Sequence, residues 1–317
     1  MNNINFELIY SNKKENSEIT SITILDNYDI VCGYMNRNII IYDNKTYNLK
    51  LKIREHNGYI KFILKLKNNR LASTSFDKLI ILYKLFDNNL KYSIEQILTS
   101  HTSSPNMIIE FNDNILMSCG GDGKIRVWNR EKINNQYQCE TIISGGLIIH
   151  SILKISNNEI VYYQLGHYLT FVSFPLFNLT FVKEINGSSY PQNMIMLNEK
   201  ILIVIGNGIQ FIDIFKHEII KVIYENIFFD VGIKFNNHQL IISSSKKINS
   251  KYIYLINLFS ISEENEINLI EKYSLQRGHC NCIRSIIKYN EKLFITGSQD
   301  CFFKIWELLS LSNEINY

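Results

Sequence analysis

The chain of 317 residues carries 33 Lys and Arg against 30 Asp and Glu, and the net charge of +3 argues against the strongly basic surface of a nucleic-acid-binding protein. No apolar run approaches the roughly 18 residues that span a bilayer, and residues 1–17 lack the basic and apolar regions of a secretory signal. We therefore expect no membrane insertion, a cytoplasmic or nuclear location, and six reduced cysteines.

Short apolar strands separated by tight turns follow one another along the chain. Residues 4–10 alternate enough to predict a strand. Three later units share a longer pattern: a histidine precedes a strand, an aspartate follows 21 residues later in a tight turn, and an aromatic residue ends the next strand. The triplets are His56, Asp77 and Tyr83; His101, Asp122 and Trp128; and His279, Asp300 and Trp306. Three identical spacings indicate an internal repeat.

This pattern resembles the WD40 repeat, which has Gly-His near its start, Trp-Asp at its end and a period of about 40–45 residues. Gly278-His279 and Trp306-Glu307 stand at these places in the last unit. The resemblance implies an all-β fold, because such repeats form β-propellers of four-stranded antiparallel blades around a central channel. It extends over the whole chain, so we expect residues 1–317 to form a single WD40-type propeller domain.

The number of blades follows from the spacing of the predicted strand–strand turns. The aligned turn positions are Asn36, Asp77, Asp122, Gly166, Gly206 and Asp300. The first five are 40–45 residues apart, and the last interval of 94 residues leaves room for two units. This spacing predicts seven blades. Because little chain follows Trp306, we expect residues 4–10 to complete the last blade as its outer strand and close the ring.

The fourth, fifth and sixth units keep the strands but lose the signature residues, and the first unit has Tyr42-Asp43 where Trp-Asp would stand. In the sixth unit we expect an extended turn from Ser243 to Lys251. The acidic stretch 260–274 follows, and within it Leu269–Ser274 is the predicted outer strand of that blade.

The resemblance implies a structural role for the three triplets. In the family the His, the turn Asp, a Ser or Thr of the second strand and the Trp form one hydrogen-bonded set inside the blade. Candidates for the hydroxyl position are Ser73 or Ser75, Ser118 or Gly120, and Thr296 or Ser298. The same residue types form the triad of serine hydrolases. Their threefold occurrence at structural spacing, with no nucleophile elbow, favours the structural role.

Metal and phosphate sites are also considered. His279, Cys280 and Cys282 could ligate a soft metal, but a structural zinc site usually takes four ligands from Cys-x₂₋₄-Cys pairs. No second pair lies nearby, although Cys301 could be close in space. The glycine-rich run 120–124 lacks the P-loop pattern and precedes a strand rather than a helix. We therefore expect no metal, no cofactor and no catalytic residue.

The resemblance also implies where a partner binds, because such propellers typically bind peptides or proteins on the face where the first strand of each blade begins. Carried over by position, the partner-binding candidates are Tyr59, Lys61, Phe76, Asn106, Tyr190, Phe228, Arg284 and Gln299. The degenerate blades add Thr20, Met35, His150, Leu165, Gln192 and Asp230 at matching places. Tyr, Phe and Arg are residue types enriched at binding interfaces.

We therefore expect a non-catalytic scaffold for protein–protein interaction, a monomer that acts as subunit or adaptor of a multiprotein complex. Two alternatives stay open: a substrate receptor of a ubiquitin ligase, and an RNA- or RNP-associated propeller. The near-balanced charge disfavours nucleic acid as the partner. An enzyme built on the channel would need inward-facing His, Asp or Glu in several blades, whereas the inner strands contain mostly Ile, Leu and Ser.

Overall fold

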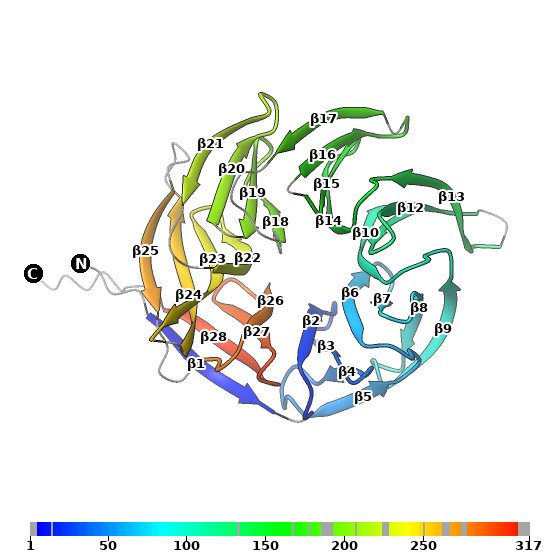
Figure 1. Ribbon diagram of the computed structural model, residues 1–317. Coiled ribbons are helices and arrows are strands. Elements are labelled where there is room, and N and C mark those ends of the chain that lie inside the picture. Colours follow the sequence, from blue (N-terminus) through cyan, green and yellow to red (C-terminus); the bar gives the residue numbers. More distant parts are fainter. Residues whose placement is uncertain are drawn as a thin grey trace, which may run out of the picture.

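The computed structural model describes residues 5–13, 15–131, 134–166, 168–176, 178–184, 193–206, 208–223, 228–249, 251–261, 267–273 and 278–309. These residues form strands and turns without a helix, so the all-β class is confirmed. The strands make seven four-stranded antiparallel sheets, arranged as the blades of a ring around a central channel (Figure 1). The predicted seven-bladed β-propeller is therefore confirmed.

Each blade is built from strands that follow one another in the chain. Blade one comprises β2 (Ile19–Ile24), β3 (Ile30–Tyr34), β4 (Ile39–Tyr42) and β5 (Leu49–Ile53). Blade two comprises β6 (Ile60–Leu66), β7 (Arg70–Ser75), β8 (Ile80–Phe86) and β9 (Lys91–Leu98). Blade three comprises β10 (Pro105–Asn112), β11 (Ile115–Gly120), β12 (Lys124–Arg130) and β13 (Tyr137–Ser144).

The second half of the ring follows the same order. Blade four comprises β14 (Ile149–Ser156), β15 (Glu159–Gln164), β16 (Tyr168–Ser173) and β17 (Leu179–Glu184). Blade five comprises β18 (Asn193–Met196), β19 (Ile201–Gly206), β20 (Gly208–Asp213) and β21 (Glu218–Ile223). Blade six comprises β22 (Phe228–Asn236), β23 (Gln239–Ile248), β24 (Lys251–Ile261) and β25 (Ile267–Tyr273). Blade seven comprises β26 (Ile283–Lys288), β27 (Leu293–Ser298), β28 (Phe303–Leu309) and β1 (Asn5–Asn12).

The N-terminal strand closes the ring, which confirms the prediction for this segment. β1 pairs antiparallel with β28 and is the outermost strand of blade seven. Figure 1 shows the two strands side by side, so the first and last strands of the chain share one sheet. This pairing covers the outer edge of β28, which would otherwise be an exposed sheet edge.

A β-bulge in β1 directs its side chains to two different neighbours. Leu8 and Tyr10 pair with adjacent residues of β28, so Ile9 between them has no pairing partner there. Because successive side chains on a strand point to opposite faces, the bulge separates Phe6 and Leu8 from Tyr10. Phe6 and Leu8 pack into the apolar cluster between blades six and seven, whereas Tyr10 packs between blades seven and one.

Seven apolar clusters hold the ring together, and each is shared by two neighbouring blades. The middle strands are therefore buried on both faces, and every residue of β19 is buried. Such a strand is a continuous apolar run, ILIVIG, because neither face meets water. The blades also approach closely: a Cβ added at Gly297 would lie 2.6 Å from the Ile22 side chain of blade one. The packing that stabilises the fold thus belongs to pairs of blades.

The predicted extended turn from Ser243 to Lys251 is wrong. β23 continues to Ile248 and β24 begins at Lys251, and the two strands pair along this whole stretch. The serines lie in the sheet because their hydroxyls find partners: Ser243 Oγ bonds the backbone of Val231 at 3.1–3.2 Å. The outer strand predicted near Leu269–Ser274 is confirmed as β25.

Candidate functional site

A hydrogen-bonded set joins the two ends of the repeat inside blade seven. Trp306 Nε1–H donates to Thr296 Oγ1 at 2.8 Å, and this hydroxyl lies 2.6 Å from His279 Nε2. On the other side of the ring, His279 Nδ1 lies 2.8 Å from the Asp300 carboxylate. Burial lowers the pKa of His279, which favours the neutral ring. In that form the Nδ1–H donates to Asp300 and the Thr296 hydroxyl donates to Nε2.

Asp300 also holds the turn in which it lies. Its carboxylate accepts hydrogen bonds from the backbone N–H groups of Cys280 and Phe302, both at 3.0 Å. Burial by itself raises the pKa of Asp300, but the hydrogen bond from His279 and these two amides outweigh burial and lower it. Because both ring nitrogens of His279 are occupied, this histidine is not available to a metal together with the nearby cysteines.

Blade three contains the same set with an added cation. His101 Nε2 lies 2.8 Å from Ser118 Oγ and its Nδ1 lies 3.0 Å from Asp122. Trp128 Nε1–H donates to Ser118 at 2.9 Å. Arg126, whose side chain is only 2% exposed, forms an ion pair with Asp122 at 2.8 Å. The corresponding strand position has a lysine in blade seven and an isoleucine in blade two. Sequence reasoning did not single out this arginine.

In blade two a tyrosine takes the place of the tryptophan. His56 lies 2.8 Å from Asp77 and 2.7 Å from Ser73 Oγ, which is 3.3 Å from the Tyr83 hydroxyl. The hydroxyl partners in the three blades are therefore Ser73, Ser118 and Thr296. All three occupy the earlier of the two positions that the sequence left open.

Blade one has no histidine in this place and uses other polar groups. Asn36, at the turn position, donates through Nδ2 to Glu15 at 2.9 Å and through its backbone to Ser17 Oγ at 3.0 Å. The hydroxyls of Tyr34 and Tyr42 are hydrogen-bonded at 2.7 Å in the interior of the blade. These contacts satisfy buried polar groups without the repeated set.

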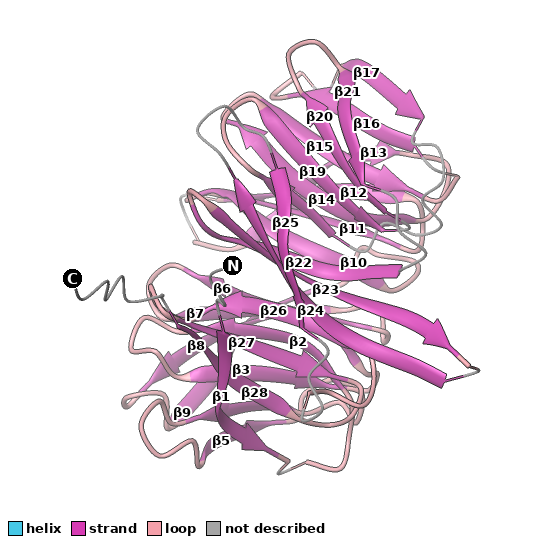
Figure 2. Ribbon diagram, turned by 90° about the vertical axis from the view of Figure 1, so that its left-hand side faces the viewer, coloured by secondary structure: helices cyan, strands magenta, loops and turns pink. Residues whose placement is uncertain are grey.

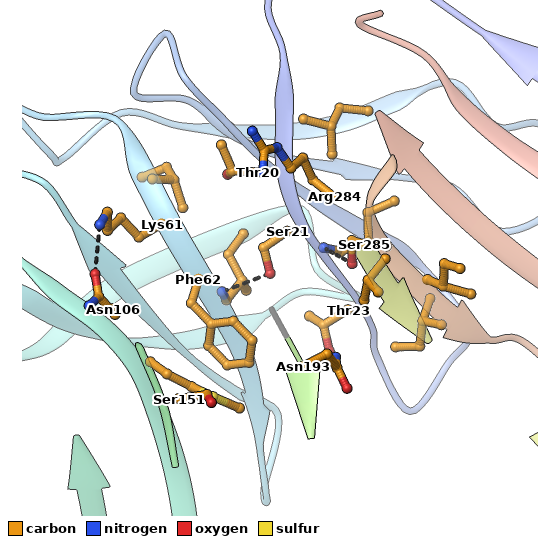
Figure 3. A pocket seen from close by; sticks show the side chains of 18 of the residues that line it. Thr20, Ser21, Thr23, Lys61, Phe62, Asn106, Ser151, Asn193, Arg284 and Ser285 are labelled. Atoms are coloured by element: carbon orange, nitrogen blue, oxygen red, sulfur yellow. Dashed lines mark hydrogen bonds between the residues drawn. The ribbon is translucent and has the colours of Figure 1, made fainter. Parts of the chain in front are cut away.

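The central channel contains a cavity of about 870 Å³, lined by the innermost strands of all seven blades. Figure 3 shows this cavity, with Lys61 of blade two joined to Asn106 of blade three and Arg284 projecting from blade seven. The Lys61–Asn106 contact is a hydrogen bond of 2.6 Å. Asn106 in turn donates to the backbone carbonyl of Ile149 at 2.7 Å. Polar contacts therefore link blades two, three and four at the channel.

A bulge at the start of the innermost strand supplies most of the channel's charged side chains. Six of the seven innermost strands skip pairing at the equivalent position, and β18 of blade five is the exception. The unpaired polar residues that line the cavity here are Thr20, Lys61, Asn106, His150, Asp230 and Arg284. A bulge re-aims the side chain of its extra residue. In six of the seven blades it directs one polar side chain toward the channel.

Comparison with known proteins agrees with the repeat seen in the structure. A family described as "WD domain, G-beta repeat" matches residues 93–129 and 271–307, which hold the sets of blades three and seven. The chain is a WD40-repeat propeller. A comparison with curated proteins finds no match. WD40 propellers are generally protein-interaction scaffolds and are typically not enzymes. The described part of the chain contains no helix that could span a membrane.

Two aromatic side chains lie beside each other where blade two of this WD40 propeller meets the channel mouth. Tyr59 precedes β6 and Phe76 lies in the β7–β8 turn, and their rings stack with centroids 4.8 Å apart at an angle of 18°. The backbone N–H of Phe76 donates to the Tyr59 carbonyl at 3.0 Å. Phe76 is 55% exposed, so its ring is a surface feature rather than part of the core.

Some of the other partner-binding candidates line the cavity and others do not. Lys61, Asn106, Arg284 and Gln299 line the same cavity as Tyr59. Gln299 donates to Glu18 Oε2 at 3.0 Å, a contact between blades seven and one. Phe228 is half exposed at the start of β22 but is not among the residues that line the cavity. Tyr190 and Gln192 lie outside the described residues.

Burial in the channel shifts the pKa values of several lining groups. Burial lowers the pKa of Lys61, and burial together with the nearby Lys61 lowers that of His150. Burial raises the pKa of Asp230 to about 7, although Arg284 opposes this shift. One carboxylate oxygen of Asp230 accepts no hydrogen bond from any described residue. The charge at the channel mouth of the propeller therefore changes near neutral pH.

His150 and Asp230, which the sequence placed on this face by position, both line the cavity. The inner strands are mostly apolar, and a bulge turns these single polar residues toward the channel without changing the composition of the strand. The described residues of the WD40 ring contain no group of three potential metal ligands.

Proposed function

We propose that this WD40 propeller is a non-catalytic scaffold that binds a partner protein at the channel mouth beside blade two. The observation that carries the proposal is the stack of the exposed Phe76 on the half-buried Tyr59, next to a cavity that is lined by Lys61 and Arg284. Aromatic side chains supply buried area at interfaces, and cations orient and attract the partner. This combination suits a short peptide segment that contains both acidic and apolar residues.

We further propose that the chain acts as a monomeric subunit or adaptor of a multiprotein complex in the cytoplasm or nucleus. All six cysteines are free thiols, which suits a reducing compartment. Positive and negative side chains are nearly balanced, which favours a protein over a nucleic acid as partner.

The test is affinity capture followed by mass spectrometry, with the Tyr59→Ala, Phe76→Ala double variant beside the natural chain. We expect the main captured partner to be lost while the melting temperature stays nearly unchanged, because Phe76 is exposed. The matched control is Phe86→Ala with Phe215→Ala, two exposed aromatics at the turns between third and fourth strands, at the other end of their blades. Equal loss in both variants, or loss in neither, would contradict the proposed site.

A further inference from the structure

The hairpin of blade six is longer than its counterparts in the other blades. β23 and β24 contain 10 and 11 residues, whereas the second and third strands of every other blade contain 4–7. The innermost strand β22 pairs with β23 only as far as Ser245. Beyond that point β23 and β24 pair only with each other among the described residues, and Figure 2 shows the hairpin extending past the neighbouring blades. We call residues 246–249 and 251–253 the blade-six arm.

The blade-six arm is basic and exposes apolar groups. It contains Lys246, Lys247 and Lys251, and residues 241–261 include no Asp or Glu at all. None of the three lysines forms an ion pair with a carboxylate of the described residues. Tyr252 is 53% exposed, and Ile248 is also exposed. Lysine side chains alone would suffice to keep an exposed strand edge from pairing with other chains. The exposed side chains of Ile248 and Tyr252 beside these lysines do not serve that purpose.

Contacts along one side of the arm hold it in place. Lys247 and Tyr252 are paired across the two strands, and the lysine Nζ lies 5.9 Å from the tyrosine ring centroid. Tyr252 stacks on Tyr254 with ring centroids 6.4 Å apart. Burial, and then the Cys282 thiol of blade seven beside it, raise the pKa of Tyr254. A free two-stranded hairpin is marginal in water, so these contacts explain how the arm keeps its shape.

We propose that the blade-six arm is a docking site for an acidic, extended segment of a partner protein, separate from the Tyr59–Phe76 stack. Lys246, Lys247 and Lys251 supply the complementary charge, and Tyr252 supplies apolar contact area. The exposed side chains of Ile248 and Tyr252 offer contact area that the apolar side chains of a peptide can cover. A nucleic acid would match only the charge of the lysines. The arm therefore favours a peptide.

The experiment measures fluorescence anisotropy of a labelled short peptide in which Glu alternates with Tyr and Leu, titrated with the full chain. The arm variant combines Lys246→Gln, Lys247→Gln and Lys251→Gln, and a second variant is Tyr252→Ala. We expect the arm variant to weaken binding about tenfold or more and Tyr252→Ala to weaken it several-fold, since charge and an aromatic anchor both contribute. The natural complex should weaken as salt is raised.

The matched control combines Lys45→Gln, Lys91→Gln and Lys216→Gln. These exposed lysines lie at or beside turns between third and fourth strands, at the end of the blades opposite the arm. The control therefore changes the net charge by the same amount as the arm variant, at a different place. Retained binding in the control with loss in the arm variant supports the proposal. Equal loss in both, no peptide binding by the full chain, or tighter arm-dependent binding of an oligothymidine of equal length would overturn it. The channel mouth suits the same kind of peptide, so the titrations are repeated in the Tyr59→Ala, Phe76→Ala background. There the remaining binding should still be lost in the arm variant and retained in the control, which separates this test from that of the channel mouth.

Discussion

Removal of the Asp122 carboxylate should destabilise the fold more than any other single aspartate change in the repeated sets. The Asp122 side chain is 3% exposed and pairs with Arg126 at 2.8 Å and with His101 at 3.0 Å. Asp122→Ala would leave the buried guanidinium of Arg126 without its carboxylate. Breaking a buried pair in this way costs about 3–5 kcal/mol, because one charge stays buried and uncompensated.

Changes of two other aspartates, Asp77 and Asp43, should cost less stability and serve as comparisons. Asp77→Ala removes the hydrogen-bond partner of His56. It leaves no buried cation without a partner, because blade two has Ile81 at the position of Arg126 in blade three. We expect a loss of about 2–3 kcal/mol from the unsatisfied buried donors. Asp43 is 33% exposed, and the hydrogen bonds that its side chain accepts from described residues come from its own turn, at Lys45 and Thr46. Asp43→Ala should therefore cost the least of the three changes.

The assay is equilibrium denaturation in urea at pH 7, with midpoints compared where the slopes agree. The expected order of midpoints is Asp43→Ala highest, Asp77→Ala next and Asp122→Ala lowest. Asp122→Asn is included because its side chain still has an acceptor for the turn amides but carries no charge beside Arg126. Its urea midpoint should lie between those of the natural chain and Asp122→Ala. Equal midpoints for Asp122→Ala and Asp43→Ala would refute the reasoning.

Two further predictions concern pH. Burial and then Arg126 lower the pKa of His101 to about 4, so the unfolded chain, with a histidine pKa of about 6.5, takes up a proton first on acidification. The contribution of His101 to stability should therefore fall between about pH 6.5 and 4 and stay constant above, and His101→Gln should remove that part of the slope in a denaturation series. Asp230 has the opposite effect, because its pKa is raised to about 7. Its ionisation opposes folding increasingly from about pH 4, the pKa of an ordinary aspartate, to about pH 7, and this cost is constant above. Asp230→Asn should accordingly be more stable than the natural chain at pH 8, by about 1–3 kcal/mol, and nearly equal to it at pH 4; a variant less stable at pH 8 would contradict this assignment.

The ring could be predicted from the sequence because its signals are local and repeated. Each tight turn needs a polar residue at a fixed place, and His, Asp and Trp recur where the buried polar groups of a blade need partners. Even blades without these residues kept apolar strands at the same spacing. The blade count followed from that spacing, and closure by the N-terminal strand followed from the short chain after Trp306.

Features that depend on one extra residue were not predictable. A bulge inserts a residue without changing composition, so the charged groups facing the channel, such as Asp230, could be proposed by position but not explained. Arg126 occupies an ordinary strand position and reveals its role only where the fold buries it against Asp122. The stretch SSSKKI, residues 243–248, has the composition of a loop, and its pairing with residues 251–256 of β24 makes it a strand.

The bulge in β1 allows a sharp test of how the ring is closed, by two single-residue deletions in one strand. Deleting Ile9 removes the residue that has no partner, so Leu8 and Tyr10 can keep both their pairing and their facing sides. Tyr10 would still pack on Tyr47 of blade one, where the ring centroids are 4.4 Å apart. We therefore expect this deletion to cost less than about 1 kcal/mol, as for an exposed site away from such contacts.

Deleting Glu7, an exposed residue of the same strand, has the opposite consequence. If the bulge at Ile9 and the pairing of Leu8 with Trp306 are kept, Phe6 moves into the position of Glu7, opposite Glu307, and its side chain turns to the other face of the sheet. Phe6 then leaves its edge-on contact with Phe294 at 5.2 Å and the cluster between blades six and seven. Loss of a buried phenylalanine at a chain end should cost about 2–4 kcal/mol. The measurement is the free energy of unfolding of the two deletion variants, by heat and by urea. If deleting Ile9 lowers it as much as deleting Glu7, then Ile9 is not a spare residue, and the side chains of β1 depend on the bulge for their packing.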